Sequence, residues 1–129
     1  NKKSGLFGIT EITGDVRDLK QLASEGNKRA DLAIDMFAYR VKKYIGAYMA
    51  ALGHVDAIIF EGGIGEHNPD VVNRCVAGLE PLGIVYDDSH NDDENYSGVI
   101  SKPESKIKMI VIPTNEELEI AKETMEAIK

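Results

Sequence analysis

The chain has 129 residues, which is enough for one small domain or for a part of a larger one. Hydrophobic residues make up 43% of it and charged residues 29%, a composition typical of a folded globular protein and not of a disordered one. The formal net charge of -7 argues against binding to nucleic acid or to an anionic membrane, because either would call for a basic patch. The single cysteine, Cys75, excludes an internal disulfide framework and fits a reducing cytoplasm.

The N-terminal region is predicted to be a loop followed by a helix. Residues 1–14 hold three glycines between small apolar residues, which predicts loop or turn structure, and without an initiator methionine this start suggests a cut inside a longer protein. Val16, Leu19 and Leu22 recur at helical spacing, which predicts a helix over residues 15–24.

The longest predicted element is a helix over residues 27–52, which Gly53 would end. Its apolar side chains recur every three or four residues and predict one continuous buried stripe. The members of this stripe are Ala33, Phe37, Val41, Tyr44 and Tyr48.

A buried strand is predicted over residues 55–60, because an apolar run there is bounded by glycines. A glycine-rich turn follows, and a helix is predicted from Asn68, with Pro69 at its first position, to about Leu79. Further short strands are expected at 83–86, 99–101 and 106–112, an acidic loop at 87–97 and a closing helix at 115–127.

This alternation of strands and helices predicts the α/β class. Only the strands at 55–60 and 107–112 have the apolar character of central parallel strands, so we expect further strands of the sheet to lie upstream of Asn1.

The first candidate site is the glycine turn after the strand at 55–60. Gly62, Gly63 and Gly65 allow the main chain to approach a flat or anionic ligand closely. The helix that starts near Asn68 would point its free amide groups toward the same crevice, which lies at the carboxyl end of a strand. Ordinary turn chemistry explains these glycines equally well. The pattern is neither a P-loop nor a dinucleotide fingerprint.

The second candidate site is the start of the closing helix. Thr114 and Glu117 have the spacing of a capping box. Glu116 has no such task, and a carboxylate at this place could hold Mg²⁺ while phosphate oxygens complete the coordination shell. From the residues alone, favourable placement of Glu116 in the field of the helix is the better explanation.

The third candidate site is the run from Asp15 to Asp18. Asp15 is suited to cap the helix that it begins, and Arg17 is suited to face a nucleotide or its phosphates. No two histidines have the spacing of metal ligands, which argues against a zinc site.

Three stretches of the chain, at residues 37–48, 56–66 and 111–118, resemble the corresponding motifs of the acetate kinase family. The resemblance extends over essentially all of the chain. It implies an incomplete C-terminal part of a ribonuclease H-like, or actin-like ATPase, domain with a mixed sheet flanked by helices. In this view residues 1–129 are the C-terminal portion of the second, nucleotide-binding domain, and the N-terminal domain lies upstream.

The resemblance also assigns the candidate residues. It implies that Asp15, Val16 and Arg17 contact the nucleotide, and that Glu116 serves Mg²⁺. The adenosine end of the ATP site would be lined by Gly63, Ile64, Gly65, Glu66 and His67. His67 stands where the family usually has asparagine.

The activity implied by the resemblance is reversible transfer of a phosphoryl group from ATP to acetate, giving ADP and acetyl phosphate, in a cytoplasmic homodimer. The catalytic residues of the family have no counterpart in this chain, so we expect the isolated chain to be inactive. The alternatives are a propionate or butyrate kinase and a non-catalytic nucleotide-binding module of the actin and Hsp70 type.

Overall fold

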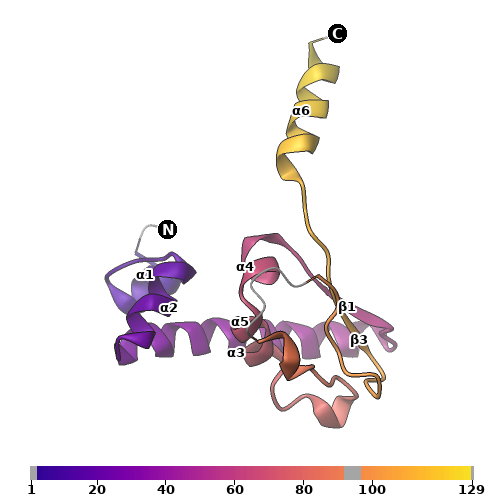
Figure 1. The fold of residues 1–129 in the computed structure, drawn as a ribbon, viewed down its shortest axis with the longest axis horizontal. Coiled ribbons are helices and arrows are strands. Elements are labelled where there is room, and N and C mark those ends of the chain that lie inside the picture. The colour runs from indigo at the N-terminus through magenta and orange to yellow at the C-terminus, as the bar shows by residue number, and fades with distance from the viewer. Residues whose placement is uncertain (1–2, 92–96, 129) are drawn as a thin grey trace.

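The long helix α3, Lys28–Leu52, is the element against which three other helices pack (Figure 1). The structure is a computed structural model that describes residues 3–91 and 97–128. The predicted bounds of α3 are confirmed, because Asn27 caps its start by accepting hydrogen bonds from the amides of Arg29 and Ala30 at 3.0 and 3.1 Å. Gly53, with φ +72°, ends it.

The buried face of α3 differs from the predicted stripe in its C-terminal half. Up to Val41 the stripe is right, but beyond it the half-buried side chains are Ile45 and Met49. Tyr44 and Tyr48 are 49% and 63% exposed, and their rings stack on each other with centroids 6.3 Å apart. A shift of one residue rotates a side chain by about 100° around the helix, which is enough to move it out of the core.

Two helices lie at the N-terminal end of α3. The helix α2, Val16–Ser24, confirms the prediction, and Asp15 caps it. The prediction of a loop over residues 1–14 is wrong in part, because Gly5–Thr10 form the short helix α1. Leu6 and Ile9 on this helix pack against the core, and this tertiary contact offsets the weak helix propensity of the glycines.

The sheet is small and mixed, with the strand order β1-β3-β2. The parallel pair is confirmed: β1, Ala57–Phe60, runs beside β3, Lys108–Val111, with Ala57 opposite Lys108 and Phe60 opposite Val111. The strand β2, Gly98–Val99, is antiparallel to β3. This arrangement confirms an α/β fold with a mixed sheet flanked by helices.

Several local predictions around the sheet need correction. The strand expected at 83–86 is a single bridge between Tyr86 and Ser101. The strand β1 is not buried on both faces, since Ile59 is 54% exposed. In the expected acidic loop, Asp88–His90 form the 3-10 turn η2, and residues 92–96 lie outside the described residues.

Two short helices follow β1. The predicted glycine turn is the helix α4, Gly62–His67, and the next helix, α5, covers Pro69–Val76 and so ends earlier than predicted. A 3-10 turn, η1, Glu80–Leu82, follows. α5 packs on α3, and between the helices and the sheet lies the core, whose largest fully buried side chains are Leu19, Val71, Val72, Val76, Ile84, Ile100, Met109 and Val111.

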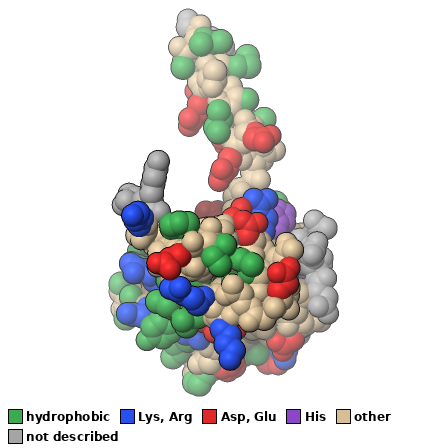
Figure 2. All heavy atoms as spheres, turned by 90° about the vertical axis from the view of Figure 1, so that its left-hand side faces the viewer, with side chains coloured by type: hydrophobic (Ala, Val, Ile, Leu, Met, Phe, Trp, Pro, Cys, Tyr) green, Lys and Arg blue, Asp and Glu red, His purple; other side chains and the backbone are tan. Residues whose placement is uncertain are grey.

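The closing helix α6, Glu116–Ala127, stands away from the rest of the chain (Figure 1). It has no buried residue, and Figure 2 shows its acidic and hydrophobic side chains exposed to solvent. The predicted capping box is wrong: the cap is Asn115, whose Oδ1 accepts a hydrogen bond from the amide of Leu118 at 3.0 Å, and Thr114 bonds Glu66 instead. Among the described residues, no helix combines the length and apolar character that crossing a bilayer requires.

Candidate functional site

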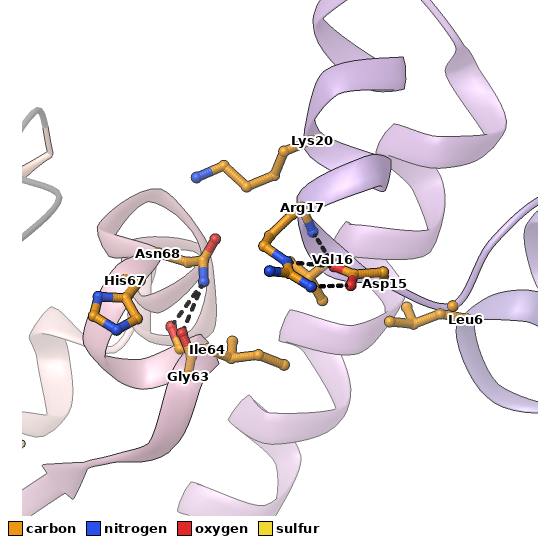
Figure 3. Close-up of a pocket in the computed structure, with 10 residues that line it drawn as sticks. Leu6, Asp15, Val16, Arg17, Lys20, Gly63, Ile64, His67 and Asn68 are labelled. Atoms are coloured by element: carbon orange, nitrogen blue, oxygen red, sulfur yellow. Dashed lines mark hydrogen bonds and ion pairs between the residues drawn. The ribbon is translucent and has the colours of Figure 1, made fainter. Parts of the chain in front are cut away.

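A pocket of about 780 Å³ lies between the N-terminal helices α1 and α2 on one side and α4 and α5 on the other (Figure 3). Its volume is within the range of small-molecule and cofactor sites. Two segments that are about fifty residues apart in the sequence therefore meet at one cavity. The lining residues are Leu6, Gly14, Asp15, Val16, Arg17, Lys20, Gly63, Ile64, His67 and Asn68.

The carboxylate of Asp15 holds Arg17 in place at the pocket. Its Oδ1 accepts hydrogen bonds from the backbone amide and the Nε of Arg17 at 2.8 and 3.1 Å, and its Oδ2 accepts from Nη2 at 2.6 Å. These bonds from Arg17 lower the pKa of Asp15 to about 2 and raise the pKa of Arg17 above its ordinary value. The guanidinium is therefore a pre-oriented positive group, and since it has five N–H donors it retains several for a ligand.

The three glycines of α4 have three different reasons to be glycine. Gly62 has φ +70°, a conformation that other residues rarely adopt. A side chain at Gly65 would meet the carbonyl carbon of Phe60 at 3.1 Å, so close packing on β1 disfavours one. At Gly63 neither reason applies, because its φ is not positive and a Cβ would meet nothing within 4 Å. Gly63 lines the pocket, so its missing side chain leaves bare backbone for a ligand to approach.

Asn68 ties α4 to the start of α5. Its Nδ2 donates to the carbonyl oxygens of Gly63 and Ile64 at 3.2 and 3.3 Å, and the residue is only 5% exposed. Asn68 is the N-cap residue of α5, as predicted, but its side chain makes no capping hydrogen bond. The predicted free amides of α5 are also few, because Pro69 has none and the amides of Val71 and Val72 donate to the Asn68 carbonyl at 3.0 Å.

Sequence reasoning missed several pocket residues, most clearly Lys20 and Leu6. Lys20 lies three residues after Arg17 on α2, so the helical period puts both on one face, and this signal could have found it. Leu6 lies in the segment that was predicted to be a loop, and the sequence carries no comparable signal for it.

Two of the predicted nucleotide-contacting residues do not line the pocket. Gly65 is buried against β1. Glu66 is turned toward Thr114, whose backbone amide and hydroxyl both donate to Glu66 Oε1, at 3.0 and 2.7 Å. These two bonds from Thr114 hold the pKa of Glu66 below its ordinary value.

Glu116, the predicted Mg²⁺ residue, is the first residue of α6 and is exposed. It does not line the pocket, but it follows Thr114, which is bonded to α4, by two residues. Within residues 3–91 and 97–128, no group of three or more His, Cys, Asp or Glu residues is suited to hold a metal ion. The single accessible carboxylate of Glu116 is compatible with Mg²⁺ binding, because this ion usually takes most of its ligands from water and substrate phosphates.

Comparisons with known proteins agree on one family. The model of the acetokinase family matches residues 1–122. The acetate kinase of Caldicellulosiruptor saccharolyticus is 59% identical over 126 residues, which are 96% of this chain and 32% of that protein. The chain therefore spans about a third of the length of such relatives.

Solved structures agree with the sequence relatives. The crystal structure of the acetate kinase of Porphyromonas gingivalis superimposes with a TM-score of 0.87 at 45% identity, covering 100% of this chain and 33% of that one. The propionate kinase of Francisella tularensis gives a TM-score of 0.83 at 39% identity, covering 94% of this chain and 30% of that one. The fold is thus the C-terminal portion of an actin-like ATPase fold, as predicted, and the chain belongs to the acetokinase family.

Proposed function

We propose that this chain forms part of the nucleotide site of a kinase that transfers a phosphoryl group reversibly between ATP and acetate. The observation that carries the proposal is the pocket between α2 and α4, where Arg17 is held by Asp15 opposite the bare backbone of Gly63. A fixed guanidinium and exposed backbone are features that suit a phosphorylated, flat ligand. Because the chain spans about a third of its relatives, the activity is proposed for the polypeptide that contains it.

In this proposal the residues of the chain bind the nucleotide and the metal ion and do not carry out the transfer itself. Arg17 orients the nucleotide through N–H groups that Asp15 leaves available, and Gly63 and Ile64 form the opposite wall. Glu116 would hold Mg²⁺, directly or through water, and the ion would neutralise charge on the phosphates. The isolated chain is expected to be inactive, since phosphoryl transfer depends on positioned charges around the moving group and the family's residues for this task have no counterpart here.

The first test is acyl phosphate formation by the full-length protein. Acetate, propionate and butyrate are each supplied with MgATP, and the product is trapped with hydroxylamine. A preference for acetate is expected, whereas a preference for propionate would move the assignment toward the activity that names the Francisella neighbour. ATP hydrolysis without any acceptor, and no acyl phosphate, would indicate a non-catalytic or Hsp70-type module and overturn the kinase proposal.

The second test addresses the pocket itself. Arg17→Ala removes the oriented guanidinium and should weaken ADP binding, measured by titration calorimetry on the full-length protein. Arg29→Ala is the matched control, because Arg29 also forms an exposed ion pair, with Glu11 at 3.3 Å, but does not line the pocket. Equal affinity in both variants would remove α2 from the nucleotide site.

The proposal includes a homodimer in the cytoplasm. A homodimer is supported by two groups of exposed apolar side chains on α3, one in each half of the helix, because subunits or domains commonly cover such side chains. They are Leu32, Met36, Tyr39, Tyr44, Tyr48 and Leu52. Light scattering on the full-length protein tests the dimer, and a monomer would contradict it. The free, buried thiol of Cys75 fits a reducing compartment, and cell fractionation tests that part.

A further inference from the structure

The contact between Glu66 and Thr114 joins the two segments that leave the parallel strands. β1 continues into α4, which carries Glu66, and β3 continues through Thr114 into α6. The two segments leave the sheet side by side, since Phe60 lies opposite Val111 and the Phe60 carbonyl accepts a hydrogen bond from the Ile112 amide at 3.1 Å. Beyond that point the two segments separate, and Glu66 reconnects them with bonds of 3.0 and 2.7 Å.

This contact ties the segment that leads into α6 to the helix α4. Within this chain α6 buries no side chain and stands apart from the other elements, so the Thr114 contact is a side-chain link close to its start. Thr114 comes two residues before Glu116, and both of its donor groups are held by one carboxylate oxygen. Glu66 thus contacts the segment that connects β3 to Glu116.

The helix α4, to which Glu66 belongs, also lines the pocket. Gly63, Ile64 and His67 line it, while Glu66, between them, is directed to Thr114. Two donors on one carboxylate oxygen form charge-assisted bonds, which are stronger and more directional than neutral ones. The lowered pKa of Glu66 agrees with a carboxylate that stays ionised for this purpose.

We infer that Glu66 is a positioning residue that sets the place of Glu116 relative to the nucleotide pocket by holding Thr114. The inference rests on the proposed function and deepens it. It also replaces the sequence-based expectation that Glu66 contacts the nucleotide directly. Binding of a nucleotide against α4 and binding of a cation at Glu116 are then coupled through one side-chain contact.

The test compares three variants of the full-length protein by calorimetry and kinetics. Thr114→Val removes the hydroxyl donor with little change of shape, Glu66→Gln removes the charge, and Thr114→Ser keeps both donors. ADP affinity is measured without Mg²⁺ and at saturating Mg²⁺, and the Mg²⁺ activation constant is measured in the hydroxylamine assay. Glu61→Gln is the matched control, since Glu61 precedes the same helix, is exposed and makes no capping bond.

We expect the two contact variants to weaken Mg²⁺ activation without weakening ADP binding in the absence of Mg²⁺. Thr114→Val and Glu66→Gln should raise the Mg²⁺ activation constant about tenfold, the size expected for loss of a hydrogen bond to a charged group. Their ADP affinity without Mg²⁺ should stay within about twofold of the wild type, and Thr114→Ser should behave as the wild type. Because both variants weaken the same contact, combining them should cost little more than either alone.

Two outcomes overturn the inference. One is an unchanged Mg²⁺ dependence in both variants. The other is an equal loss of ADP affinity with and without Mg²⁺, which would make Glu66 a nucleotide contact or a purely structural residue. Failure of the proposed function is a different result, namely a wild-type protein that forms no acyl phosphate. In that case the effect of Mg²⁺ on ADP affinity still decides the role of Glu66.

Discussion

Lys20 Nζ lies 2.7 Å from Asp70 Oδ1, although fifty residues separate the two in the sequence. Lys20 belongs to α2 and lines the pocket, and Asp70 belongs to the first turn of α5. α2 and α5 both pack on α3, and this ion pair links them directly. The pair therefore joins the two walls of the pocket.

The ion pair predicts that Lys20→Gln and Asp70→Asn act in the same direction. Both should lower nucleotide affinity, because either one releases the two walls from each other. Each should lower the free energy of unfolding by less than about 1 kcal/mol, since both side chains remain a third or more exposed and water screens the pair. ADP titrations and denaturant unfolding measure the two effects. If Asp70→Asn strengthens binding, Lys20 is a ligand-binding cation that Asp70 restrains, and the linking role is wrong.

Gly63 and Gly65 are predicted to respond oppositely to alanine. Gly63→Ala should leave the free energy of unfolding unchanged or raise it by up to about 1 kcal/mol, because alanine favours a helix, but its methyl group enters the pocket and should weaken nucleotide binding. Gly65→Ala should destabilise the protein by about 1–3 kcal/mol, because the new Cβ meets Phe60, whose carbonyl is held by Ile112. Thermal unfolding and ADP titration of both variants test this contrast. Loss of stability in both variants, or unchanged ADP affinity in Gly63→Ala, would contradict it.

Asn68 is predicted to tolerate alanine better than aspartate. Asn68→Ala removes two donated hydrogen bonds at a buried site and should cost about 1–3 kcal/mol. Asn68→Asp should cost more, because a carboxylate cannot donate and would face the carbonyl oxygens of Gly63 and Ile64. Denaturant unfolding at neutral pH measures the difference. The opposite order would show that the amide does not hold α4 through these two bonds.

The thiol of Cys75 is predicted to be inert and to weaken the fold at high pH. It is 3% exposed, and burial raises its pKa to about 11, while Lys42 acts in the opposite direction to a smaller extent. Peptide-resolved labelling with a thiol reagent at pH 8 should therefore be slow in the native protein and fast in denaturant.

The sign of the pH effect follows from the direction of that pKa shift. In the unfolded chain Cys75 ionises near its ordinary value of 9.0, but in the folded chain only near about 11. Its contribution to stability is therefore complete below pH 9 and is lost as the pH rises toward 11. The difference in unfolding free energy between the wild type and Cys75→Ala should shrink over this interval, and a constant difference would refute the assignment.

Local signals allowed the parallel strands and the helices α2, α3, α5 and α6 to be predicted, but not α1 or α4. The start of α3 at Asn27 and its end at Gly53 follow from capping chemistry, which depends on a few neighbouring residues. The pair of β1 and β3 follows from two apolar runs. The motifs also gave residues on both walls of the pocket, 15–17 on one side and Gly63, Ile64 and His67 on the other.

Local patterns miss the partner of a side chain where that partner lies on another element. The spacing of Thr114 and Glu117 is that of a capping box, but Glu66 binds the Thr114 side chain from another element. Asn68 is the N-cap residue of α5, but its side-chain amide donates to two carbonyl oxygens of α4. In each case the competing group is remote in sequence or belongs to a helix that was not expected, so a local pattern contains no information about it.

The helix α4 has a consequence for how the site moves. Three of its six residues are glycine, and a helix of that length and composition is not stable on its own. It is kept folded by outside contacts, among them the Asn68 amide and the packing of Gly65 on Phe60. Such a segment opens at a small fraction of the free energy of global unfolding. Its amide hydrogens should exchange with solvent faster than those of α3, and a bound ligand should slow that exchange at the helix that it touches.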